Sequence, residues 1–139
     1  MSITQGLKRA MQINRRGTAT LFGERRRTWE EFGGRVAKLA GALRGLGLGD
    51  GGRVAILALN SDRYLECYYA VPWAGGIVVP LNVRLAPPEL IYTLNDSGAE
   101  ILVVDDIFTA MLPAFRGKLS TVRRIIFADD APTGGHAEL

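Results

Sequence analysis

The 139-residue chain is 47% hydrophobic and 22% charged, proportions typical of a globular domain with enough apolar material for a core. Its net charge is +3, and its arginines are mostly scattered, without a long basic block or basic–aromatic interleaving, so the composition argues against nucleic-acid binding. The single cysteine excludes an internal disulfide, and no apolar run is long enough for a signal peptide or a transmembrane segment, so we expect a soluble, cytoplasmic protein.

The N-terminal residues predict a short helix and a β-hairpin. Apolar residues at helical spacing predict the helix over 3–14. Two short segments, 18–22 and 25–28, flank Gly23-Glu24, a pattern typical of a hairpin with a two-residue turn. We interpret Arg25-Arg26-Arg27 as a solvated strand and turn in preference to an anion site.

A second helix is predicted directly after the hairpin. Thr28 and Glu31 have the spacing of a capping box, and the helix that follows ends in a glycine-rich stretch. Residues 47–52, GLGDGG, match the spacing GxGxxG, but a dinucleotide fingerprint follows a strand and opens a helix. These glycines follow a helix and precede a strand, so they predict a helix end and a turn.

The rest of the chain alternates between apolar strands and helices. Strands are expected at 54–59, 77–79, 101–104 and 124–128, with helices at 62–74, 87–97 and about 107–119, the last interrupted by Pro113 and Gly117. The alternation predicts an α/β fold, in which a mostly parallel sheet has flanking helices in flavodoxin- or Rossmann-like layers, preceded by the short helix and the hairpin. We expect this α/β segment to fill residues 1–130, with a loose C-terminal tail at 131–139.

Few residues suggest chemistry. His136 lies in the expected tail without partners, and Cys67 lies in a helix without a neighbouring cation, which predicts a structural thiol. Asp105-Asp106 and Asp129-Asp130 follow predicted strands at the sheet edge where α/β proteins bind ligands. Acids there can hold Mg²⁺ or cap the next segment, and we favour capping. The phosphate loop GxxxxGK[ST] and the motifs CxxC, HExxH and GxSxG are all absent.

A resemblance adds to this interpretation. Residues 76–106, GIVVPLNVRLAPPELIYTLNDSGAEILVVDD, resemble the N-terminal region of AMP-forming acyl-CoA synthetases, in the adenylate-forming superfamily, and fatty-acid ligases are the branch most similar to them. The resemblance extends over about residues 2–128 and implies part of the large N-terminal domain, incomplete in this chain. We expect Pro80, Asn82 and Arg84 to be scaffold, with ligand contact by Asn82 or Arg84 as the alternative.

The resemblance also implies an activity for the parent enzyme. Family members convert a carboxylic or fatty acid, ATP and coenzyme A to acyl-CoA, AMP and diphosphate through an acyl-adenylate, with Mg²⁺. The family's Ser/Thr/Gly-rich phosphate loop and later motifs are missing, so we expect this chain alone to be inactive, with no catalytic or metal residues and no tightly bound cofactor.

Two kinds of partner follow from this expectation. One is the remainder of a synthetase, in cis or in trans, and the other is a second copy of the chain, meeting it through exposed apolar surface. An alternative is a non-catalytic α/β interaction module derived from the family. A flavodoxin-like nucleotide binder is the least supported reading, because no phosphate loop follows a strand.

Overall fold

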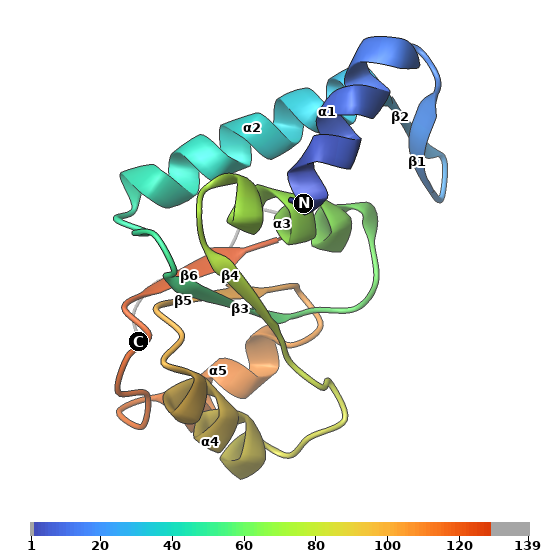
Figure 1. Cartoon of the computed structure of the whole chain (residues 1–139). Helices are drawn as coiled ribbons and strands as arrows, with labels where there is room; N and C mark the ends of the chain where they lie inside the picture. Colours follow the sequence, from blue (N-terminus) through green and yellow to red (C-terminus); the bar gives the residue numbers. More distant parts are fainter. Residues whose placement is uncertain (1, 129–139) are drawn as a thin grey trace. The chain divides into compact units, whose positions relative to one another are not determined.

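The computed structural model describes residues 2–128, which form two compact units (Figure 1). Unit 1 consists of Met1–Asp50 and Asn60–Gly76, and unit 2 consists of Gly51–Leu59 and the chain from Ile77 onward. The chain therefore leaves unit 1 to form one strand, returns to it for one helix, and leaves it again.

Unit 1 contains helices and a hairpin. Its elements are α1 (Ile3–Ile13), β1 (Thr18–Phe22), β2 (Arg25–Thr28), α2 (Trp29–Gly45) and α3 (Asp62–Trp73). The short helix, the antiparallel hairpin and the two longer helices were all predicted from the sequence, and each is confirmed to within two residues.

Local signals explain where these elements begin and turn. Phe22 pairs with Arg25 across the hairpin turn, and Gly23 occupies the left-handed conformation there, with a φ of 58°. The capping box is present: Thr28 Oγ1 accepts the backbone N–H of Glu31 at 3.2 Å, and the Glu31 carboxylate accepts that of Thr28 at 2.8 Å. These bonds satisfy N–H groups that the first turn of α2 leaves without helical partners.

The GLGDGG stretch forms a turn. Gly47 and Gly51 have positive φ angles of 89° and 75°, and the segment links the end of α2 to the next strand. The prediction of a helix end and a turn is confirmed, because no helix begins at these glycines.

Unit 2 is a parallel sheet with helices. Its elements are β3 (Arg53–Leu57), β4 (Ile77–Pro80), α4 (Pro87–Ser97), β5 (Ile101–Val104), η1 (Thr109–Met111), α5 (Leu112–Phe115) and β6 (Arg124–Phe127). The strand order is β4-β3-β5-β6, and all three neighbouring pairs are parallel. The α/β fold with a parallel sheet is thus confirmed.

The core of unit 2 lies between the sheet and the two helices α4 and α5, which lie on the same side of it in Figure 1. Alternate residues of β3 and β5 point into this core, since successive side chains of a strand face opposite ways. The buried members are Ala55, Leu57, Leu81, Leu90, Leu94, Ala99, Leu102, Val104, Phe108, Leu112 and Phe115.

The helix predicted over about 107–119, with interruptions at Pro113 and Gly117, is shorter than expected. The chain forms a single 3₁₀ turn at Thr109–Met111 and a four-residue helix at Leu112–Phe115. Pro113 suits only the first turn of a helix, and Gly117 turns the chain with a φ of 70°. The strand predicted over 54–59 is also shorter, since β3 ends at Leu57.

Candidate functional site

The loop between β4 and α4 carries the two residues that the sequence singled out. Asn82 Oδ1 accepts the backbone N–H of Arg84 at 3.0 Å, and the Asn82 carbonyl accepts that of Leu85 at 3.1 Å. Such bonds are typical of an asparagine that stabilises a turn. Both Asn82 and Arg84 are exposed, and no partner for the Arg84 guanidinium is found among residues 2–128.

Asp105 lies at the carboxyl edge of the sheet, where the strand order reverses between β3 and β5. Its Oδ2 accepts the backbone N–H of Leu59 at 2.7 Å, and its Oδ1 accepts that of Phe108 at 3.2 Å. Leu59 follows β3 and Phe108 follows β5, so one carboxylate joins the ends of two neighbouring strands. Ligands of α/β proteins often bind at such a point, but here both oxygens are bonded to backbone amides. Asp105 thus caps the turn after β5 through Phe108, whereas the short helices that follow have no side-chain cap.

The remaining acidic candidates do not form a metal centre in the part that the structure describes. Within residues 2–128, no group of three or more His, Cys, Asp or Glu side chains is placed to hold a metal ion. Asp129-Asp130 and His136, which the sequence also singled out, lie outside the described residues.

A group of charged side chains lies inside unit 1, and we call it the arginine–carboxylate cluster: Arg25, Arg27, Arg35, Asp62 and Glu66. Asp62 accepts hydrogen bonds from Arg25 at 2.6 and 2.7 Å and from Arg27 at 3.0 Å. Glu66 accepts two from Arg35, at 2.5 and 3.0 Å. Both carboxylate residues are buried, 3% and 4% exposed, so the cluster ties α3 to β2 and α2.

This cluster corrects the sequence interpretation of Arg25-Arg26-Arg27. Arg25 and Arg27 are not simply solvated, because both reach the buried Asp62. Burial raises the pKa of the Asp62 carboxyl, but the hydrogen bond from Arg25 and the charges of Arg25 and Arg27 outweigh burial, so the pKa lies below its usual value. The spacing of Asp62 and Glu66, one helical turn apart in a predicted helix, was the available signal.

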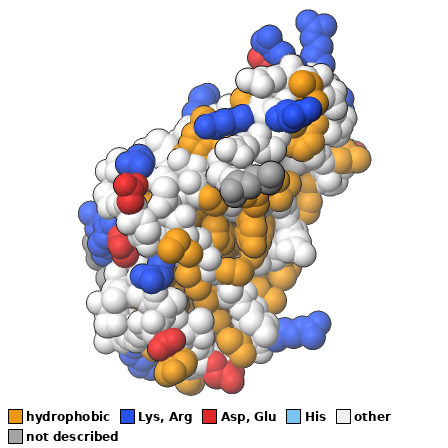
Figure 2. All heavy atoms as spheres, viewed as in Figure 1, with side chains coloured by type: hydrophobic (Ala, Val, Ile, Leu, Met, Phe, Trp, Pro, Cys, Tyr) orange, Lys and Arg blue, Asp and Glu red, His pale blue; other side chains and the backbone are white. Residues whose placement is uncertain are grey.

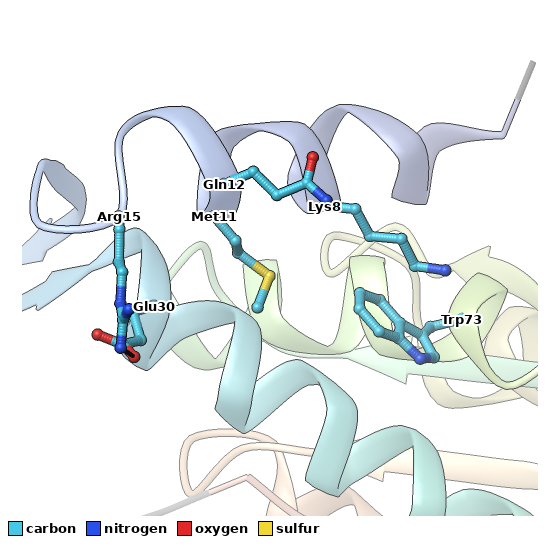
Figure 3. Close-up of a pocket in the computed structure, with 6 residues that line it drawn as sticks. All are labelled: Lys8, Met11, Gln12, Arg15, Glu30 and Trp73. Carbon is cyan, nitrogen blue, oxygen red and sulfur yellow. Dashed lines mark hydrogen bonds and ion pairs between the residues drawn. The ribbon is translucent and has the colours of Figure 1, made fainter.

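A groove lies beside α1 in unit 1 (Figure 3). It has a volume of about 630 Å³ and is lined by Lys8, Met11, Gln12, Arg15, Glu30 and Trp73. The Lys8 ammonium lies 4.7 Å from the centre of the Trp73 ring, a cation–π contact, and Arg15 forms an ion pair with Glu30. The hydrogen bond from Arg15 lowers the pKa of the Glu30 carboxyl.

A second groove, of about 540 Å³, follows β2 and α2. Its lining is Arg25, Arg26, Arg27, Glu30, Glu31, Gly34, Arg35 and Lys38. Three of its five cations already bind the carboxylates of the arginine–carboxylate cluster. Both grooves offer contacts to a ligand, but neither lining contains a serine, threonine, cysteine or histidine.

Cys67 is also unsuited to act as a nucleophile in the folded chain. It is 5% exposed, and burial, reinforced by the charge of Glu66, raises the pKa of its thiol to about 12. At pH 8 the thiolate fraction is then roughly a thousandfold below that of a free cysteine, and only the thiolate attacks alkylating reagents. We expect iodoacetamide to modify the native chain at least ~100-fold more slowly than the chain in denaturant. Equal rates under the two conditions would contradict a buried structural thiol.

The described residues thus include two grooves and an ion-pair cluster. Comparison with known proteins shows to which family the chain belongs. The model of one family, AMP-binding enzyme, matches residues 7–138. The chain belongs to this family.

Several relatives within the AMP-binding enzyme family are acid–CoA ligases. The chain is 41% identical to a long-chain-fatty-acid–CoA ligase of Thermus thermophilus over 110 residues, which are 78% of this chain and 20% of that protein. It is 34% identical to an indoleacetate–CoA ligase of Aromatoleum aromaticum over 135 residues, 97% of this chain and 26% of the relative. The recognition of an acyl-CoA synthetase from the sequence is confirmed.

Solved structures agree with the family assignment. An anthranilate CoA ligase in complex with anthranoyl-AMP matches 91% of this chain with a TM-score of 0.87 and 28% identity, over 25% of that chain. The N-terminal domain of FACL13 from Mycobacterium tuberculosis matches 93% of this chain, with a TM-score of 0.87, 28% identity and 34% of that chain covered.

The chain thus spans about a fifth to a quarter of the length of the curated ligases it matches. Among residues 2–128, no helix is both long enough and apolar enough to cross a membrane.

Proposed function

We propose that the chain is the N-terminal part of an ATP-dependent acid–CoA ligase, with a fatty acid as the preferred class of substrate. One observation carries the proposal: the family match extends over residues 7–138, and the 41% identical relative is a long-chain-fatty-acid–CoA ligase. The complete enzyme would convert the acid, ATP and coenzyme A to acyl-CoA, AMP and diphosphate through an acyl-adenylate, with Mg²⁺.

In this proposal the chain supplies scaffold and does not catalyse the reaction by itself. Adenylation requires preorganised cationic and backbone donors around the phosphates. The sequence has no phosphate loop, and three of the described carboxylates, Asp62, Glu66 and Asp105, bind arginines or backbone amides. ATP, Mg²⁺ and coenzyme A therefore belong to the complete ligase, which we place in the cytoplasm.

The incomplete domain, residues 1–130, would join the remainder of the ligase in cis or in trans, and residues 131–139 would form a tail or connection. Asn82 and Arg84 keep a scaffold role in this proposal, since Asn82 already stabilises the loop after β4. Contact of either residue with a ligand would depend on the missing part of the enzyme.

The test uses the chain alone and a chimera in which it replaces the matched segment of the Thermus thermophilus ligase. We expect no ATP–pyrophosphate exchange with a fatty acid from the chain alone, and exchange from the chimera. Turnover by the pure chain would overturn the scaffold role. A folded chimera without exchange, beside an active parent enzyme, would contradict assignment of the chain to a ligase.

A further inference from the structure

The groove beside α1 presents basic and apolar side chains next to one another. Lys8, Met11 and Gln12 lie on one face of the helix, at positions i, i+3 and i+4, and Arg15 continues the row beyond the helix end. One residue each of α2 and α3 completes the lining, so the groove lies entirely in unit 1. In Figure 2, Lys and Arg side chains likewise adjoin hydrophobic ones over the part of unit 1 where Figure 1 has α1. Such a surface suits a ligand that is both charged and apolar.

The floor of this groove is fixed by close packing of α1 on α2. The Met11 side chain points from α1 towards α2 in Figure 3, and it lies directly against Gly33. A Cβ atom at Gly33 would lie 2.1 Å from the Met11 sulfur, so a larger residue would displace this side chain. Leu7 of α1 is 2% exposed and holds the helix in place. The apolar floor therefore exists before a ligand binds, which lowers the ordering cost of binding.

The charges of the groove leave one cation available to a ligand. Arg15 and Glu30 form an ion pair at one end (Figure 3). Lys8 lies at the other end, with its ammonium 4.7 Å from the centre of the Trp73 ring, and no carboxylate partner is found for it among residues 2–128. An ammonium carries three N–H donors, so contact with one ring face leaves donors for an anion. The groove thus suits a single negative charge near Lys8.

The space between the two ends defines the rest of the ligand. It is bordered by the Met11 thioether and the Trp73 ring, and both groups make favourable contacts with aromatic rings. The row from Lys8 to Arg15 covers about two helical turns, or roughly 10 Å. That length suits one or two fused rings and is short for the extended chain of a long fatty acid. The groove volume of about 630 Å³ is typical of a small-molecule site.

We propose that this groove binds a small aromatic monocarboxylate, whose carboxylate accepts N–H groups from Lys8 and whose ring packs against Met11 and Trp73. A divalent cation does not fit, because the single carboxylate of the lining, Glu30, is paired with Arg15. A multiply charged anion does not fit either, because one cation alone is available. This inference goes beyond the proposed function, since the residues that carry it have no part in the assignment to a ligase.

The test is a titration of the 139-residue chain with 1-naphthoate, followed residue by residue with ¹H–¹⁵N NMR. We expect the Lys8 and Met11 amides and the Trp73 indole N–H to shift together, with a dissociation constant on the order of 1 mM for a probe of this size. The amides of β5, in unit 2, should not shift. Absence of a saturable shift at the three groove signals, at probe concentrations up to about ten times that constant, would overturn the proposal.

Two variants of equal charge locate the carboxylate. Lys8→Gln and Lys38→Gln each remove the charge of one exposed lysine, but Lys38 belongs to the second groove. We expect Lys8→Gln to weaken binding about fivefold and Lys38→Gln less than about twofold. Lys8→Arg keeps the charge and the contact with the Trp73 ring, so it should retain the affinity within about twofold. Equal weakening by the two glutamine variants, or a larger effect of Lys38→Gln, would overturn the proposal.

A second probe tests the sign of the ligand charge. 1-Naphthylmethylammonium has the same rings and a positive charge, so we expect it to bind at least about fivefold more weakly than 1-naphthoate. Equal affinity of the two probes would contradict recognition of a carboxylate. Calorimetric titration of the chimera with the Thermus thermophilus ligase, with and without Lys8→Gln, extends the comparison to the complete enzyme. Pyrophosphate exchange by the chimera is a separate readout: an active chimera that binds 1-naphthoate equally well with Lys8→Gln would keep the proposed function and overturn this site.

Discussion

Replacement of Asp62 by asparagine is expected to destabilise the chain by about 3 kcal/mol. The Asp62 carboxylate accepts three hydrogen bonds from Arg25 and Arg27, and its side chain is 1% exposed. Asparagine keeps the size but loses the charge, and its NH₂ group would face a guanidinium donor. The Arg27 side chain, 13% exposed, would then keep a partly buried charge with only the longer contact to Glu66, at 3.8 Å, to balance it. Urea unfolding followed by circular dichroism measures the effect.

Asp50→Asn is the matched control for this change. Asp50 forms an ion pair with Arg44 at 3.1 Å, but its side chain is 88% exposed. Exposed pairs contribute about 0–1 kcal/mol, so this variant should unfold close to the parent chain. If the two variants lost equal stability, the arginine–carboxylate cluster would contribute no more than an ordinary surface pair.

Comparison of the parent chain with Asp62→Asn also predicts how the stability difference depends on pH, with a definite sign. Because the pKa of Asp62 is lowered in the folded chain, its ionised form stabilises the fold above the unfolded-state pKa of about 3.9. That contribution falls as the pH drops through the folded-state pKa. The stability difference between the parent chain and Asp62→Asn should therefore be constant near neutral pH and shrink below about pH 4. A difference independent of pH would contradict a role for the Asp62 charge.

Phe115→Ala is expected to cost about 3–5 kcal/mol, the loss typical of a large-to-small change in a core. Phe115 is 1% exposed and belongs to the cluster that α4 and α5 form against the sheet. Alanine loses the transfer free energy of the ring and leaves a cavity that the short α5 fills only by shifting. Small domains have a total stability of ~5–15 kcal/mol, so this loss should leave unit 2 only marginally stable. Chemical denaturation with hydrogen exchange at β5 measures this loss.

Tyr92→Ala provides the control for the loss of an aromatic ring. Tyr92 lies on α4 and is 71% exposed, so its truncation should change stability by no more than about 0.5 kcal/mol. A similar loss for Phe115→Ala would mean that α5 does not contribute to the core of unit 2.

Elements that depend on neighbouring residues were predicted well. The capping box of Thr28 and Glu31, the hairpin turn at Gly23 and the glycine turn after α2 each use bonds or φ angles within a few residues. The alternation of apolar strands and helices likewise specified a parallel sheet. The prediction was least accurate at 107–119, where the interruptions at Pro113 and Gly117 leave only a 3₁₀ turn and a four-residue helix.

The sequence by itself thus determined the class of fold, most element bounds and the resemblance to acyl-CoA synthetases, because these follow from local residue types and their spacing. Tertiary structure decided the strand order and the arginine–carboxylate cluster. Arg25 and Asp62 are 37 residues apart, and Arg35 and Glu66 are 31 apart. No local pattern specifies such pairs, because they depend on how β2, α2 and α3 pack within unit 1. The function of Asp105 also required the fold, since only the adjacency of β3 and β5 brings Leu59 to its carboxylate.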